Sequence, residues 1–389
     1  MSLGLTSVPS LRGEGVLAAS ARRAPRIALV LPALGAGGSE GVVSFLANQW
    51  ALRGWQVAIV TPEADGTAPY YALSPSVELR RLNVPVRRYG PMLGAAMTAR
   101  RLHLLRRTFL ELRPDLVVSF LTRTNVLSVL AARGTGIPVI VSERNNPEMQ
   151  SFGPVWSRLR SWSYPKAYGL ITMTQGAMDC FPREQRRRSW VIPNQVHLPP
   201  DIVPRRNGNT VAAVGRLVPQ KGFDLLLEAF AQIADLHPDW KLVIWGEGPE
   251  RERLTAQRDA LGLAGRVHLP GVSERPGAWI ETTDVFVLSS RYEGWGIVLM
   301  EAMAAGLPVV AFDCRFGPRE MITHGEDGLL VPDGNIGALA ASLSLLLRDH
   351  SLRRSLAAHA RLSARRFSSE NVMAAWDDVV DAALNARRL

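Results

Sequence analysis

Short runs of apolar residues alternate along the chain with longer segments in which apolar residues recur at helical spacing. The run R-I-A-L-V-L-P at residues 26–32 predicts a buried strand, and the glycine turn G-A-G-G-S-E-G follows at 35–41. Residues 42–53 have the spacing of a helix that ends at Gly54, and W-Q-V-A-I-V-T at 55–61 predicts the next strand. This order of elements is a β-loop-α-β unit, which is typical of a parallel sheet.

The same alternation continues in two blocks, separated by a polar, proline-rich stretch at residues 199–209. Strands are predicted at 115–121, 138–144, 169–174 and 190–194 in the first block, and at 210–215, 241–246, 266–271, 284–290, 308–313 and 328–332 in the second. Helices intervene, notably at 224–236 and 296–305. The pattern predicts an α/β chain of two doubly wound, Rossmann-like domains that face each other across a cleft.

The predicted domains span residues 25–200 and 201–369. Residues 1–24 show no clear period and are predicted to form a loose tail. A last helix, residues 370–389, could cross back to the first domain, and the pattern leaves this open.

Composition narrows the class of protein. The chain has 389 residues, 47% of them apolar, which suits two globular domains. The two cysteines lack C-x-x-C spacing, which favours a reducing, cytoplasmic compartment and argues against a structural zinc site. The longest candidate for a membrane span, residues 294–312, is interrupted by Glu301 and Pro308, and the N-terminus matches a signal peptide poorly.

Charge is distributed unevenly between the two halves. Residues 1–200 hold 24 Lys and Arg against 11 Asp and Glu, a net charge of +13, whereas residues 201–389 carry −3. A basic half suits nucleic acid, an anionic membrane or an acidic substrate. Only Lys166, Lys221 and Lys241 are lysines among the 45 basic residues, so each lysine position is informative.

Candidate chemistry lies in the loops that follow the predicted strands, because open α/β sheets bind ligands at the carboxyl ends of their strands. The turn at 35–41 either brings backbone N–H groups to a phosphate or is a plain tight turn, and both interpretations stay open. A dinucleotide fingerprint would need glycine where Glu40 stands, which disfavours a dehydrogenase.

The loop G-R-L-V-P-Q-K-G at 215–222 follows the first strand of the second domain. Its two cations, Arg216 and Lys221, can grip a diphosphate. The alternative is a solvated pair beside a turn. The scarcity of lysine and the strand-end position favour the diphosphate.

The stretch S-R-Y-E-G-W-G-I-V-L-M-E-A-M places Glu293 in a turn and Glu301 about one turn into a helix. The amides at the helix start, those of Gly296, Ile297 and Val298, favour an anion. Carboxylates on either side suit sugar and ribose hydroxyls, although a helix-start charge and a salt bridge would also explain them. The sequence has no D-x-D motif, so a nucleotide-sugar enzyme would neutralise its diphosphate with Arg, Lys and helix N-termini rather than a dedicated metal site.

Several motifs in this order are those of a known family. They are G-G-S-E at 37–40, V-I-P-N at 191–194, G-R-L-V-P-Q-K-G-F-D at 215–224, G-E-G-P-E at 246–250 and the stretch at 291–310. In these motifs the chain resembles the retaining glycosyltransferase family 4, which has the GT-B fold. The resemblance covers nearly the whole chain beyond the tail. The strings at 141–147 and 312–322 resemble bacterial members that extend lipid-linked or polysaccharide glycans.

The resemblance implies roles for matching positions. Arg216, Lys221 and Glu293 would be catalytic, the two cations on the donor diphosphate and the carboxylate on the sugar hydroxyls. Glu301 would hold the ribose, and the backbone near Val272 would face the base. The other implied donor contacts are Gly37, Gly38, Gly294, Gly296, Ile297 and Val298. It also implies retention of anomeric configuration by front-face displacement, with the departing diphosphate as the base.

The first domain departs from the family at one position. Many members have a histidine after the strand at 115–121, whereas this chain has T-R-T-N at 122–125. Arg123 or Asn125 is expected to substitute for it, and Arg144 and Asn146 are further expected acceptor contacts. What replaces the histidine stays open.

The expected reaction is transfer of a hexosyl or N-acetylhexosaminyl group from a nucleotide sugar, a UDP-sugar by the resemblance, to a glycan acceptor that could be polyprenyl-diphosphate-linked. No cofactor, metal or nucleic acid is expected. Basic and aromatic residues at 100–113, 156–164 and 183–188 favour an anionic membrane, the inner face of the plasma membrane, although solvated helix faces explain each segment alone. Alternatives are a nucleotide-sugar 2-epimerase, a soluble small-molecule acceptor or a nucleic-acid-binding module.

Overall fold

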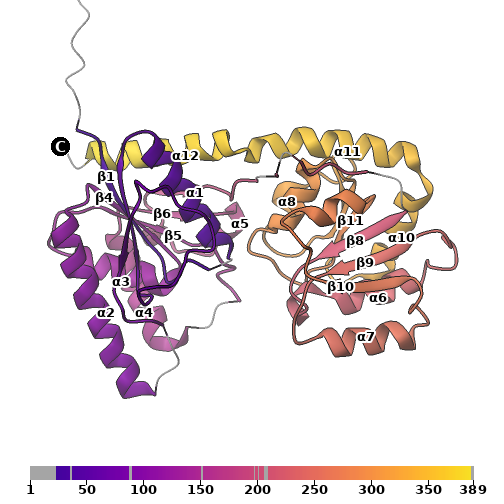
Figure 1. The fold of residues 1–389 in the computed structure, drawn as a ribbon, viewed down its shortest axis with the longest axis horizontal. Helices are drawn as coiled ribbons and strands as arrows, with labels where there is room; N and C mark the ends of the chain where they lie inside the picture. The colour runs from indigo at the N-terminus through magenta and orange to yellow at the C-terminus, as the bar shows by residue number, and fades with distance from the viewer. Residues whose placement is uncertain are drawn as a thin grey trace, which may run out of the picture.

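The computed structural model describes residues 23–35, 37–86, 90–149, 152–196, 198–199, 201–205 and 209–386. Nearly all of the predicted tail, and the last three residues of the predicted final helix, lie outside this range. Figure 1 shows two α/β domains side by side, with the C-terminal helices running along both of them.

The first domain is built on a seven-stranded parallel sheet. Its strands are β1 (Arg26–Val30), β2 (Gln56–Thr61), β3 (Glu78–Arg81), β4 (Leu116–Phe120), β5 (Val139–Ser142), β6 (Gly169–Thr172) and β7 (Ser189–Val191). They lie in the order β3-β2-β1-β4-β5-β6-β7. The first three strands are added toward one edge of the sheet and the remaining strands toward the other, so the order changes side between the parallel neighbours β1 and β4. β3 was not predicted, because its sequence E-L-R-R has no apolar run.

Helices cover both faces of this sheet. They are α1 (Gly38–Leu52), α2 (Pro91–Leu112), α3 (Thr122–Ala132), α4 (Gly153–Ser163) and α5 (Gln175–Asp179). The α1 helix starts at Gly38, four residues before the predicted start, because the apolar spacing begins only after its polar first turn.

The second domain repeats the architecture with six parallel strands. They are β8 (Thr210–Val214), β9 (Lys241–Trp245), β10 (Val267–Gly271), β11 (Val285–Leu288), β12 (Val309–Phe312) and β13 (Leu329–Val331), in the order β10-β9-β8-β11-β12-β13. Its helices are α6 (Phe223–Ala231), α7 (Arg251–Ala260), α8 (Ile297–Ala304), α9 (Pro318–Met321), α10 (Ile336–Arg348) and α11 (His350–Ala364). The order in which strands are added to the sheet changes side between β8 and β11, although the two strands are parallel. The predicted helix at 224–236 ends early, at Ala231.

The final helix, α12 (Ser369–Ala386), returns to the first domain (Figure 1). Its buried residues recur at helical spacing and join the core that contains β1 and β4; they are Val372, Met373, Trp376, Val379, Val380, Ala383 and Leu384. The amide of Val196 donates to the carbonyl of Phe367 at 2.9 Å, so the two segments that connect the domains run side by side.

No helix among the described residues has the length and apolar character that crossing a membrane requires.

Candidate active site

The strongest concentration of predicted site residues lies at the reversal point of the second sheet. The loops after β8 and β11, residues 215–222 and 289–296, leave neighbouring strands at their carboxyl ends. Ligands of doubly wound sheets bind at this position. The predicted Arg216, Lys221 and Glu293 all lie on these two loops.

Lys221 and Glu293 form an ion pair across the two loops. Nζ of Lys221 lies 2.6 Å from Oε1 of Glu293, and the hydroxyl of Ser290 donates to the same oxygen at 2.7 Å. Both side chains are largely buried, with 15% and 7% of their surfaces exposed. The pair therefore presents a cation and a carboxylate side by side at the strand ends.

Two glycines let these loops approach so closely. A Cβ at Gly215 would lie 3.0 Å from the aliphatic stem of Lys221, so this stem packs on the Gly215 backbone. Gly222 has a left-handed φ of 61°, and a Cβ there would lie 2.0 Å from the carbonyl oxygen of Ser289. Ser289 in turn donates its hydroxyl to the Lys221 carbonyl at 2.9 Å.

A second ion pair, missed by the sequence analysis, fixes the loop after β11. The guanidinium of Arg291 donates to both carboxylate oxygens of Asp224 on α6, at 2.8 and 2.7 Å. These hydrogen bonds hold the pKa of Asp224 below its ordinary value. Both residues lie within the sequence motifs quoted above, and this position is the signal that could have identified them.

The loop after β11 ends where α8 begins. Gly296 caps this helix in a left-handed conformation with φ of 97°, and the first amides of the helix, those of Ile297 and Val298, have no partner within the helix. The opposite side of the helix is anchored in the core through Leu299 and Met300. The helix start is thus fixed beside Glu293.

Glu301 is the other predicted carboxylate, on α8. Burial raises its pKa from 4.5 to about 7. Among the described residues, no side chain forms an ion pair or hydrogen bond with this carboxylate. Its charge also contributes to a raised pKa of Tyr71, behind burial and the charges of Tyr70 and Glu40, which places Glu301 near the first domain.

The remaining predicted donor residues lie around this centre. Arg216 is exposed, and its guanidinium forms no ion pair or hydrogen bond within the described part of the chain. Val272 follows β10 and is 71% exposed. Each therefore has free surface toward a ligand.

The first domain meets this centre through the start of α1. A Cβ at Gly38 would lie 2.8 Å from Cδ1 of Ile297 and 3.8 Å from Nδ2 of Asn194, so the starts of α1 and α8 pack together. The carboxylate of Glu40 folds back over Gly37, where a Cβ would lie 2.2 Å from Oε2. Burial and the charge of Glu63 raise the pKa of Glu40.

A second contact between the domains uses the segment after β5. Asn146 donates its amide to the carbonyl of Glu293 at 3.3 Å, and a Cβ at Gly294 would lie 3.4 Å from the Asn146 backbone nitrogen. The predicted acceptor residue Asn146 thus touches the loop that carries the catalytic candidate Glu293.

Arg144, also predicted as an acceptor contact, is only 5% exposed. Its guanidinium donates to the carbonyl of Ile192 and to Oδ1 of Asn194, both at 3.0 Å. It also lies 5.7 and 5.3 Å from the ring centres of Phe120 and Trp376. Burial lowers its pKa to about 9. In this conformation Arg144 ties the connecting segment and α12 to the sheet.

Of the two residues predicted to replace the family's histidine, only Arg123 is exposed. Its guanidinium lies 5.3 Å from the ring centre of Trp156. Asn125 is fully buried and donates to Tyr164 and to the Ser142 carbonyl, both at 3.1 Å.

A buried carboxylate beneath this region was missed. Glu143 is 4% exposed and accepts hydrogen bonds from Tyr164 and, at 2.8 Å, from Thr122. Burial raises its pKa, and these hydrogen bonds oppose the shift. Its position directly after a buried strand was the available signal.

Further contacts hold the two domains in this arrangement. Glu320 on α9 accepts from the amides of Gln175 and Gly176 at the start of α5, at 2.7 and 3.0 Å. Arg315 pairs with Glu148 at 2.6 Å. All five residues lie outside the loops of the site, so contacts other than those of the site also hold the two domains together.

Two family models match the chain. The glycosyl transferase 4-like domain matches residues 37–195, and glycosyl transferases group 1 matches residues 198–363. The chain belongs to the GT-B glycosyltransferases.

Curated relatives of this chain include glycosyltransferases. The lipopolysaccharide core biosynthesis glycosyltransferase LpsD of Rhizobium meliloti is 31% identical over 59% of this chain and 70% of its own. A Campylobacter jejuni α-1,4-N-acetylgalactosaminyltransferase, whose name specifies an undecaprenol-PP-linked acceptor, is 27% identical over 93% and 99%. An exopolysaccharide phosphotransferase of Streptomyces coelicolor is 37% identical over 51% of this chain, but the match spans only 21% of that protein.

Solved structures share the fold. Sucrose-phosphate synthase from Thermosynechococcus elongatus superposes with a TM-score of 0.78 at 22% identity, covering 93% of this chain and 100% of its own. HepE of Anabaena in complex with UDP has a TM-score of 0.73 at 20% identity, covering 92% and 100%. The predicted fold, two Rossmann-like domains of the GT-B type, is confirmed.

Proposed function

We propose that this chain is a retaining, family 4 enzyme that moves a hexosyl or N-acetylhexosaminyl group from a UDP-sugar to a glycan in cell-surface polysaccharide or glycoconjugate synthesis. The observation that carries the proposal is the Lys221–Glu293 pair beside the start of α8. A cation for the diphosphate and a carboxylate for sugar hydroxyls stand side by side at the position where doubly wound sheets bind ligands.

Binding of the donor would replace the contact between Lys221 and Glu293 by contacts of each residue with the donor. Lys221 leaves Glu293 for the diphosphate, together with the exposed Arg216, and Glu293 then accepts from hydroxyls of the transferred sugar. The amides of Ile297 and Val298 face the same diphosphate. HepE is a protein of this fold that binds UDP, which supports uracil as the base.

Other donor contacts follow from the same pose. Glu301, which lacks a partner among the described residues, accepts from the ribose hydroxyls, and the exposed backbone at Val272 faces the base. Gly294 and Gly296 leave room for the sugar and phosphate, and Gly37 and Gly38 bring the start of α1 to them.

The proposed step is a front-face displacement. The bond between the anomeric carbon and the diphosphate oxygen breaks, and the acceptor hydroxyl forms a new bond on the same face. The departing diphosphate oxygen takes the proton of that hydroxyl. Arg216 and Lys221 neutralise the charge that develops on the leaving group, so no metal ion is required.

The acceptor is proposed to be a glycan on a polyprenyl-diphosphate carrier, by analogy with the Campylobacter relative. Exposed apolar residues precede the arginines of α2, with Met92 89% and Leu93 54% exposed, and Val155 on α4 is 66% exposed. These surfaces would place the first domain on an anionic membrane at the inner face of the plasma membrane.

A thermal-shift panel of UDP-, GDP- and ADP-sugars tests the donor site, because a bound ligand raises stability by mass action. UDP-sugars are expected to shift the transition, and they should shift it less in Lys221→Met/Glu293→Gln, which replaces both partners of the buried pair. NMR of the product reports its anomeric configuration, and activity in EDTA reports metal dependence. Absence of a shift with every nucleotide sugar would contradict the proposal.

Vesicle sedimentation tests the membrane contact separately. Recovery with anionic vesicles is expected to exceed recovery with zwitterionic ones, and Met92→Ser/Leu93→Ser should reduce it. Equal recovery with both vesicle types argues against binding to an anionic membrane and leaves the donor assignment unaffected.

A further inference from the structure

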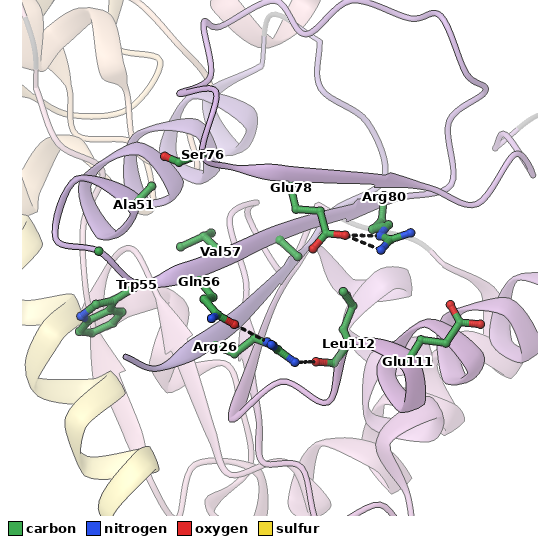
Figure 2. A pocket seen from close by; sticks show the side chains of 12 residues that line it. Arg26, Ala51, Trp55, Gln56, Val57, Ser76, Glu78, Arg80, Glu111 and Leu112 are labelled. Carbon is green, nitrogen blue, oxygen red and sulfur yellow. Dashed lines mark hydrogen bonds and ion pairs between the residues drawn. The ribbon is translucent and has the colours of Figure 1, made fainter. Parts of the chain in front are cut away.

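Two pockets open in the first domain at the amino ends of its strands, opposite to the ends that carry the candidate active site. The first, about 550 Å³, lies at the start of β1, β2 and β3 (Figure 2). Its charged wall residues are two arginines and two glutamates, and Arg80 and Glu78 pair at 2.5 Å. The formal charges of this pocket cancel, so it offers no excess charge to a ligand.

The second pocket, about 440 Å³, lies where α3 and α4 end and where β5, β6 and β7 begin. Its charged wall residues are Arg133, Lys166 and Arg188, one from each of three segments. No carboxylate belongs to the described wall. The same domain thus holds one neutral pocket and one with three uncompensated cations.

Aromatic rings hold these cations in place. Nζ of Lys166 lies 3.7 Å from the ring centre of Trp162, and the guanidinium carbon of Arg133 lies 5.5 Å from the same centre. The guanidinium carbon of Arg188 lies 4.9 Å from the ring centre of Tyr168. Within the described chain, none of the three cations pairs with a carboxylate. Two like charges on one indole repel each other, and an anion between them would relieve that repulsion.

We propose that this second pocket binds a phosphate group. Guanidinium forks donate to phosphate oxygens in pairs and an ammonium group adds a point charge, so cations from three segments can share the oxygens of one phosphate or diphosphate. The exposed edge of Trp162, which is 42% exposed, offers an apolar surface beside the phosphate. The phosphate of a lipid headgroup and a free phosphate or phosphate ester have the same chemistry.

The pocket goes beyond the proposed function and does not depend on it. It lies at the amino ends of the strands, whereas the donor would bind at the carboxyl ends of the second sheet, so the two sites do not compete for one phosphate. One of the three lysines of the chain, Lys166, belongs to this pocket, and another, Lys221, to the donor site.

The test measures phosphate binding in two arms, at physiological ionic strength. Calorimetry with inorganic pyrophosphate is done with every protein in the Lys221→Met/Glu293→Gln background, which disables the donor site without adding a second diphosphate to the solution. Sedimentation compares phosphatidylcholine vesicles with vesicles that also contain phosphatidylglycerol. The pocket variant is Arg133→Gln/Lys166→Gln/Arg188→Gln. The matched control, Arg354→Gln/Arg361→Gln/Arg365→Gln, removes the same charge from exposed positions that the second domain contributes.

The pocket variant is expected to bind pyrophosphate, anionic vesicles or both at least about tenfold more weakly than the control, the factor that corresponds to one lost charge-assisted hydrogen bond. Loss confined to vesicles identifies a lipid headgroup, and loss of pyrophosphate binding identifies a free phosphate. The proposal is overturned if the protein with an intact pocket binds neither probe, or if the pocket variant and the control match in both arms. If the triple variant unfolds at a much lower temperature than wild type, Lys166→Gln replaces it as the pocket variant in both arms.

Discussion

Lys221 and Glu293 pair at 2.6 Å although 72 residues separate them in the chain. Their burial makes single substitutions ambiguous, because removing one partner leaves an uncompensated charge, which costs about 3–5 kcal/mol in buried pairs. A loss of activity in Glu293→Ala would therefore mix loss of chemistry with loss of fold. Replacing both partners together avoids this difficulty.

The double variant Lys221→Met/Glu293→Gln is expected to keep the free energy of unfolding within about 1–2 kcal/mol of wild type, since exchanging a whole buried pair for neutral groups is often tolerated. Sugar transfer should fall by about 10²-fold or more, the scale of removing one preorganised charge-stabilising donor. Denaturant unfolding and a transfer assay measure the two effects. A stable double variant with wild-type turnover would refute the catalytic roles.

The raised pKa of Glu301 makes stability depend on pH. The folded state holds a proton up to about pH 7, whereas the unfolded carboxyl releases it near 4.5, so the folded state binds more protons in this window. Stability therefore falls as pH rises from about 4.5 to about 7, by up to about 3 kcal/mol. Glu301→Gln, which does not titrate, should lose this slope.

The measurement is the free energy of unfolding of both proteins across pH 4–8, without nucleotide. A constant difference between them reflects packing, so the prediction concerns only how the difference changes with pH. Glu326→Gln, which alters an exposed carboxylate elsewhere in the second domain, serves as a comparison. Parallel curves for wild type and Glu301→Gln would show that the carboxylate is not held protonated.

Gly222→Ala should unfold the loop that carries Lys221. The new Cβ would lie 2.0 Å from the rigid carbonyl oxygen of Ser289, in addition to the cost of about 1–2 kcal/mol for a left-handed residue. Gly262→Ala, in the same domain, has the same left-handed constraint, with φ of 72°, but its Cβ would meet nothing within 4 Å. The difference between the two variants in thermal unfolding isolates the clash, and equal midpoints would mean that the loops are not in this contact.

Much of the fold could be predicted from the sequence because parallel strands buried on both faces are continuous apolar runs, as in β4 and β12. β3 could not be predicted, because an edge strand with the sequence E-L-R-R has no such run. The path of α12 was equally hidden, since an apolar helix face does not reveal which domain it covers.

The candidate site also has residues that could be predicted from the sequence and residues whose environment could not. Arg216, Lys221 and Glu293 were recognisable because each follows a strand within a motif. Arg144 stands in an equivalent position but is buried, because its guanidinium meets partners that come from later parts of the chain. Contacts of this kind depend on packing between elements that are distant in the sequence, so local sequence patterns do not predict them.

The final prediction concerns α12, whose Trp376 is fully buried and packs 5.9 Å from Phe120 and 6.5 Å from Trp50 between ring centres. Trp376→Ala should cost about 3–5 kcal/mol, because it removes a large ring from a packed core and uncovers one face of the Arg144 guanidinium. The first domain should then unfold at a lower temperature than the second, which calorimetry resolves. Leu52→Ala, at a side chain of α1 that is 76% exposed, is the control and should change stability by less than about 1 kcal/mol. Equal effects of the two substitutions would show that α12 does not complete the core of the first domain.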